Sequence, residues 1–72
     1  MGCMNADGTL TDRAKAILRS LAPPATAEEV AARIEEPIFL IRSGLRQLEG
    51  VGLVRMLSGE RYEVTDSGKA KA

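Results

Sequence analysis

The chain has 72 residues, no net charge, no histidine, no tryptophan and one cysteine. A chain of this length forms one small domain, which buries only about 60% of the surface that it exposes when unfolded. The single cysteine excludes a disulfide within the chain, and the lack of histidine argues against a metal cage and against acid–base catalysis near neutral pH. We therefore expect no enzymatic activity and no cofactor.

The amino-terminal residues carry no targeting or membrane signal. No apolar run approaches the ~20 residues that a membrane span requires, and no signal peptide opens the chain. Residues 1–8 are small and polar and are expected to form a disordered lead-in, with Cys3 as a free thiol. The expected compartment is the reducing cytoplasm, with no membrane partner.

The first helix is predicted to begin at Thr9, because Asp12 follows three residues later and the pair has the spacing of a capping box. Apolar residues then recur at helical period and predict a buried face. They are Leu10, Ala14, Ile17, Leu18 and Leu21. The helix is expected to end before Pro23, because a residue that precedes proline disfavours helical geometry.

A second helix is predicted to begin at Thr26, which forms another capping-box pair with Glu29. Val30, Ala31 and Ile34 form its apolar stripe, and Pro37 requires the helix to stop at about Glu35.

The third helix is predicted over about residues 37–49, with Pro37 in its first turn and Gly50 or Gly52 at its end. Ile41, Leu45 and Leu48 lie within about 60° of one another on a helical wheel and are predicted to face the core. The opposite face then carries Phe39, Arg42, Ser43, Arg46 and, at its edge, Gln47.

Beyond the third helix the pattern changes to β structure. Residues 53–57 and 61–65 are rich in β-prone side chains, and Ser58, Gly59 and Glu60 between them favour a turn. Residues 66–68 are expected to close the second strand, and residues 69–72 to form a flexible tail. The predicted fold class is α+β, with three helices followed by a two-stranded hairpin over residues 53–65.

Charge is unevenly distributed along the chain. Residues 1–36 contain four basic and six acidic side chains. Residues 37–62 contain two glutamates and four arginines, which are Arg42, Arg46, Arg55 and Arg61. The second half is therefore mildly basic, and its cations are arginines, which bind phosphates and guanine edges bidentately.

These residues resemble the core of the bacterial winged helix-turn-helix regulators. The resemblance rests on Glu29-Val30-Ala31, Ile41, Leu45, Leu48-Glu49 and Gly52-Leu53-Val54-Arg55. The later Tyr62-x-Val64-Thr65-x-x-Gly68 is similar to the end of the wing in MarR-like and ArsR-like regulators. The match implies a winged-helix domain over residues 9–68.

The resemblance implies a sequence-specific, DNA-binding transcriptional regulator whose partner is double-stranded DNA. The third helix would enter the major groove, and the hairpin would lie along an adjacent minor groove or the backbone. Arg42 and Arg46 could contact guanine edges or phosphates, and Thr26 matches the position where the second helix meets the DNA backbone. The full set of implied DNA-binding residues is Thr26, Phe39, Arg42, Ser43, Arg46, Gln47, Arg55, Ser58 and Arg61.

One feature of the third helix favours another class of function. Phe39 and Leu40 point away from the predicted core, and an exposed apolar patch of this kind is typical of protein contacts. The alternative hypothesis is a winged-helix interaction module that binds a protein through Phe39 and Leu40, or through the first helix, without binding DNA. A homodimer would use the same surfaces.

Overall fold

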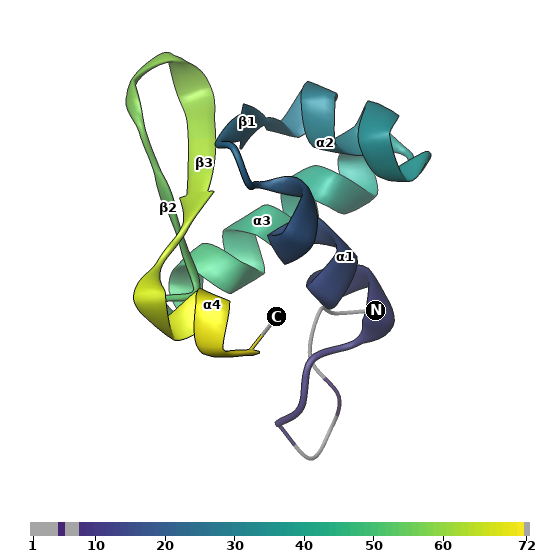
Figure 1. Ribbon diagram of the computed structural model, residues 1–72. Coiled ribbons are helices and arrows are strands. Elements are labelled where there is room, and N and C mark those ends of the chain that lie inside the picture. Colours follow the sequence, from purple (N-terminus) through teal and green to yellow (C-terminus); the bar gives the residue numbers. More distant parts are fainter. Residues whose placement is uncertain (1–4, 6–7, 72) are drawn as a thin grey trace.

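The computed structural model describes residue 5 and residues 8–71, so most of the predicted lead-in, including Cys3, lies outside the described residues. The fold is α+β, and its described part contains four α-helices and a three-stranded antiparallel sheet of order β1-β3-β2 (Figure 1). The elements in chain order are α1 (Asp12–Ser20), β1 (Ala25–Thr26), α2 (Ala27–Ile34), α3 (Ile38–Gly50), β2 (Val54–Met56), the 3-10 turn η1 (Ser58–Glu60), β3 (Arg61–Val64) and α4 (Asp66–Lys71).

Helix α1 begins two residues later than predicted. Its N-cap is Thr11, whose hydroxyl accepts a hydrogen bond from the N–H of Ala14 at 3.2 Å. The predicted cap, Thr9, instead accepts a hydrogen bond at its hydroxyl from the side-chain amide of Asn5. The prediction of a capping box between Thr9 and Asp12 was therefore wrong, because Thr11 is an equally suitable N-cap and takes that position.

Helix α2 has the predicted capping box. The hydroxyl of Thr26 accepts from the N–H of Glu29 at 3.2 Å, and the carboxylate of Glu29 accepts from the N–H of Thr26 at 2.8 Å. Glu35 ends the helix in the left-handed region, at φ 56°. Pro37 then forms the N-cap of α3, one residue before the helical position predicted for it.

Helix α3 buries the predicted stripe, since Ile41, Leu45 and Leu48 are each 0% exposed. The helix ends at Gly50, and Gly52, two residues further on, adopts a left-handed conformation at φ 81°. The N–H of Gly52 donates to the carbonyl of Glu49, and that of Leu53 donates to the carbonyl of Leu48, which satisfies two carbonyls of the last turn.

The predicted hairpin is present, with Arg55 opposite Glu63 and Met56 opposite Tyr62. The sheet has a third strand that was not predicted. Strand β1 pairs with β3, so that Thr26 lies opposite Arg61. The start of α2 is thereby held against the hairpin.

The carboxy-terminal segment differs from the prediction of a closed strand and a tail, because residues 66–71 form helix α4. The hydroxyl of Thr65 accepts from the N–H of Gly68 at 3.2 Å and donates to the carbonyl of Gly52 at 2.7 Å. Thr65 therefore begins α4 and ties it to the end of α3.

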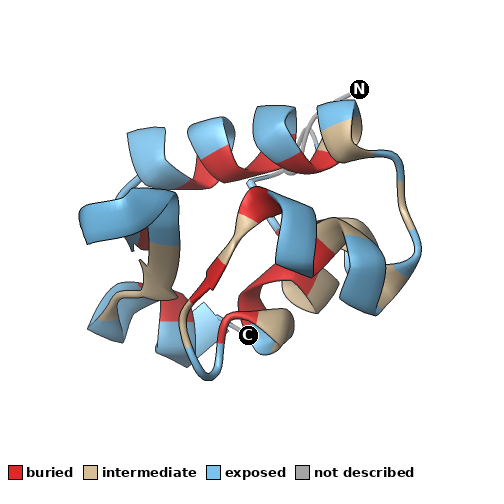
Figure 2. Ribbon diagram, turned by 90° about the horizontal axis from the view of Figure 1, so that it is seen from above, coloured by how far each residue is buried: buried red, intermediate tan, exposed pale blue. Residues whose placement is uncertain are grey.

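The core lies between the helices and the inner face of the hairpin. Figure 2 shows buried positions on the sides of the helices that face one another and exposed positions on the outer sides. All five residues predicted for the apolar face of the first helix are buried. No helix in the described part of the chain has the length and apolar character that crossing a membrane requires.

Candidate nucleic-acid interface

The outer face of α3 is exposed to solvent because the apolar stripe on its other side faces the core. The residues predicted for this face are all exposed: Phe39, Arg42, Ser43, Arg46 and Gln47. Phe39 is 68% exposed, as predicted, whereas Leu40 is partly buried. The prediction that Leu40 is exposed was therefore wrong in part. The exposed apolar patch at the start of α3 consists mainly of the phenyl ring of Phe39.

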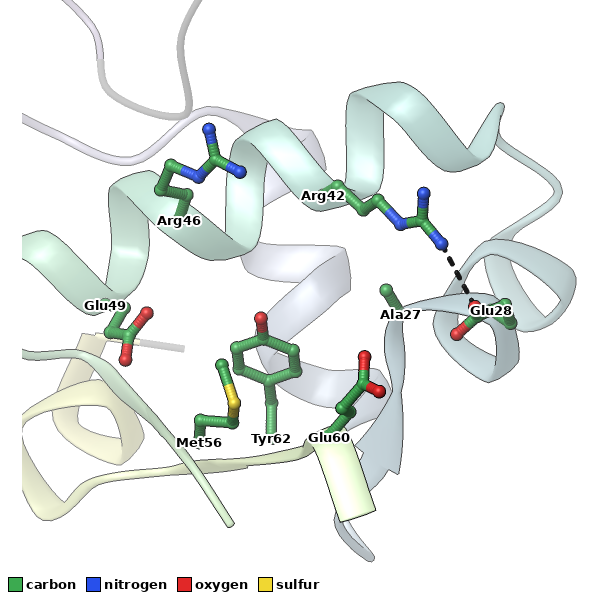
Figure 3. Close-up of a pocket in the computed structure, with 8 residues that line it drawn as sticks. All are labelled: Ala27, Glu28, Arg42, Arg46, Glu49, Met56, Glu60 and Tyr62. Atoms are coloured by element: carbon green, nitrogen blue, oxygen red, sulfur yellow. Dashed lines mark hydrogen bonds and ion pairs between the residues drawn. The ribbon is translucent and has the colours of Figure 1, made fainter. Parts of the chain in front are cut away.

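A pocket of about 270 Å³ separates this helix from the hairpin and the start of α2 (Figure 3). Two arginines, three glutamates, a tyrosine and a methionine contribute side chains to it. The lining residues are Ala27, Glu28, Arg42, Arg46, Glu49, Met56, Glu60 and Tyr62. The pocket therefore carries charges of both signs.

Arg42 forms an ion pair with Glu28, with 3.1 Å between Nη2 and Oε2. Both side chains are more than half exposed, at 59% and 67%. A hydrogen bond from its own backbone N–H, followed by the hydrogen bond from Arg42, lowers the pKa of Glu28 below its ordinary value, against the opposing effect of desolvation. Glu28 is therefore ionised at neutral pH and compensates the charge of Arg42.

Arg46 lies one turn further along α3. It forms no ion pair within the described part of the chain. In Figure 3 its guanidinium extends away from the carboxyl groups of Glu49 and Glu60. Arg46 is therefore the arginine of this face that is most available to an anionic or hydrogen-bond-accepting ligand.

Thr26 lies at the junction of β1, α2 and the hairpin. Its hydroxyl and N–H are both engaged in the capping box with Glu29, and the hydrogen bond from that N–H is the main reason why the pKa of Glu29 is lowered. Arg61, which is opposite Thr26 in the sheet, also lowers this pKa through its charge. The side chain of Thr26 therefore has a structural role in this state.

The predicted residues of the hairpin do not all lie with those of α3. Adjacent residues of a strand point to opposite faces, so Arg55 projects away from the face on which Met56 and Tyr62 line the pocket. Arg55 pairs instead with Glu63 and lines a separate pocket next to α4. Arg55 therefore lies apart from Arg42 and Arg46, and its contact with DNA as a residue of the wing stays a prediction.

The tip of the hairpin keeps two predicted residues exposed. Ser58 and Arg61 are both exposed, and the Nε of Arg61 donates to the carbonyl of Ser58 at 3.5 Å. This long bond is weak. Arg61 precedes Tyr62 in β3, so its side chain lies on the same face of the hairpin as Arg55 and does not line the pocket, and a ligand would reach it at the tip of the hairpin.

Sequence reasoning missed Glu28, Met56 and Tyr62 as residues of the pocket. The alternation of the hairpin could have assigned Met56 and Tyr62 to one face, opposite Arg55. Nothing in the local pattern indicates the contact of Glu28 with Arg42, because fourteen residues separate them.

In the described residues, no group of three or more carboxylate, histidine or cysteine side chains could hold a metal ion. Comparisons with protein-family models, with curated proteins and with solved structures found no match.

Proposed function

We propose that this protein is a small winged helix-turn-helix domain that binds double-stranded DNA and acts as a sequence-specific transcriptional regulator. The observation that carries the proposal is the orientation of α3. Its apolar stripe is fully buried, which leaves Arg42, Ser43 and Arg46 on an exposed face beside an antiparallel β-ribbon. An α-helix with such a face fits the major groove, which is ~12 Å wide.

The residues of this face have the chemistry that base readout requires. The guanidinium of Arg46 can donate two parallel hydrogen bonds to a guanine edge or clamp a phosphate. The hydroxyl of Ser43 can bond to either, and the phenyl ring of Phe39 can pack on a thymine methyl group. At the hairpin tip, Ser58 and Arg61 are exposed and can contact the DNA backbone.

The charge distribution limits how this surface can bind. Net charge is zero, and the glutamates of the pocket lie beside the two arginines. Because the affinity and the salt dependence of binding without sequence preference both grow with the number of phosphate contacts, such binding should be weak and should depend only modestly on salt. The affinity for a preferred site would then depend on a few contacts from α3.

A titration with DNA tests the proposal. We expect amide NMR signals of residues 39–47 and 58–61 to shift when a mixed-sequence duplex is added at low salt, because these residues would contact it. Signals of Arg55 and of α4 serve as internal controls and should move less. Absence of shifts at low salt, or shifts confined to other surfaces, would contradict DNA binding through α3.

A second candidate function is a protein-interaction module, which the 68% exposure of Phe39 favours. Such a ring on a helix face is a typical anchor of a protein contact. If this candidate holds, Phe39→Ser should abolish binding to a partner captured by the immobilised chain, with an unchanged circular dichroism spectrum. Val51→Ser is the matched control, since Val51 is also exposed, at 51%, but at the other end of α3. Retained binding by the Phe39 variant would eliminate this role for the ring.

A further inference from the structure

We infer, on the basis of the proposed DNA-binding function, that Glu28 competes with DNA for Arg42. This competition weakens the binding of the protein to any duplex that lacks the preferred site. The two side chains come from different helices, Glu28 from the first turn of α2 and Arg42 from the exposed face of α3. The guanidinium that would contact DNA is therefore already bound to a carboxylate of the same molecule.

The geometry of the pair allows exchange with an external ligand. The two groups are joined by one contact of 3.1 Å, and both remain more than half exposed. Exposed ion pairs of this kind contribute little free energy, because water and salt screen them. A phosphate or a base edge that approaches α3 can therefore displace Glu28 from Arg42, whereas a buried pair would resist exchange.

Glu28 stays ionised when DNA approaches. The hydrogen bond from its own backbone N–H and its position in the first turn of α2 both stabilise the ionised carboxylate. Even after Arg42 has been displaced, this negative charge remains near the arginine and repels a phosphate there. A neutral guanine edge meets less repulsion than a phosphate does.

This difference gives Glu28 an effect on selectivity. Binding without sequence preference comes almost entirely from phosphate contacts. A carboxylate that opposes a phosphate near Arg42 therefore weakens such binding, while base contacts of Arg46 remain. Removing the carboxylate should increase affinity for any duplex and make that affinity more dependent on salt.

The pocket contains a matched control for Glu28. Glu49 also lines it, also carries one negative charge, and forms no ion pair within the described part of the chain. Glu28→Gln and Glu49→Gln therefore remove the same charge from the same pocket, but only the first removes the charge that pairs with Arg42. Neither residue belongs to the capping box of α2, which uses Glu29.

The experiment measures binding of a labelled mixed-sequence duplex by fluorescence anisotropy over a series of salt concentrations. Glu28→Gln should bind roughly three- to tenfold more tightly than the unmodified chain, as expected for the loss of one exposed like charge near a phosphate. The slope of log affinity against log salt should steepen by about one unit, because Arg42 gains a phosphate contact. Glu49→Gln should give a smaller gain and an unchanged slope.

A double variant separates competition for Arg42 from a general charge effect. In the presence of Arg42→Ala, the substitution Glu28→Gln should give no more gain than Glu49→Gln. Equal gains for the two single variants, or a gain that persists without Arg42, would overturn the inference while leaving DNA binding intact. If neither the unmodified chain nor Glu28→Gln binds the duplex at low salt, the proposed function itself fails, and the inference fails with it.

Discussion

Gly68→Ala is expected to lower the free energy of unfolding by about 1–3 kcal/mol, the usual cost of forcing extra volume into a packed interior. A Cβ atom at this position would lie 2.1 Å from the carbonyl oxygen of Leu53 and 2.6 Å from Cγ1 of Val64. The carbonyl of Leu53 cannot move cheaply, because it accepts a hydrogen bond from the N–H of Thr65 at 3.0 Å. Helix α4 would have to shift away from the end of α3.

The measurement is a denaturant or thermal unfolding curve, for which Gly50→Ala is the matched control. Gly50 is the last residue of α3, and a Cβ atom there would meet nothing within 4 Å. Alanine favours the helix over glycine, so Gly50→Ala should be neutral or stabilising by up to ~1 kcal/mol. Opposite signs for the two variants would attribute the loss at Gly68 to packing. Equal stability of Gly68→Ala and the unmodified chain would show that α4 does not pack on Leu53.

The parts of the fold that could be predicted from the sequence are those determined by local pattern. The spacing of Ile41, Leu45 and Leu48 identified the buried face of α3, and the pair Thr26 and Glu29 identified the start of α2. In both cases the residues that form the structure lie within a few turns of each other. Helical period and capping depend on residues close together in the sequence, so they can be recognised before the fold is known.

Structure that depends on distant contacts was not predicted. Helix α4 has a glycine in its middle, and its sequence has little intrinsic preference for a helix. It forms where Thr65 bonds to the end of α3 and Gly68 packs on Leu53. Strand β1 is only two residues long and exists because β3 lies beside it. Both elements require the fold before they can be recognised.

The candidate site also has a part that the local sequence pattern predicts and a part that depends on distant contacts. The outer face of α3 followed from the period of its inner face, so the exposure of Arg42 and Arg46 could be predicted. The partner of Arg42 could not, because Glu28 reaches it only through the packing of α2 on α3. Arg55 was included among the DNA-binding residues because it is a cation in the hairpin, and only the register shows that its side chain lies on the face away from the pocket.

Arg46→Ala is expected to weaken binding to a preferred duplex by ~1–3 kcal/mol, or about 5- to 150-fold, if Arg46 contacts a base edge. The effect should exceed that of Arg42→Ala. Arg42 is already paired with Glu28, whereas Arg46 forms no ion pair in the described residues and is exposed. Replacing Arg46 should leave the fold unchanged, because its side chain lies outside the core. Anisotropy titrations with duplexes selected from a random pool would measure the loss.

The dependence on sequence and salt determines which contact Arg46 makes. A base contact predicts a large loss on the selected duplex and a small loss on a mixed-sequence one, whereas a phosphate contact predicts similar losses on both and a salt slope lower by about one unit. Arg19→Ala is the control for removal of one positive charge, because Arg19 is exposed but lines a different pocket, beside β3 and α4. If Arg19→Ala and Arg46→Ala weaken binding equally, DNA responds only to the total charge of the domain. The outer face of α3 would then have no specific role in recognition, and its arginines would be solvated surface residues.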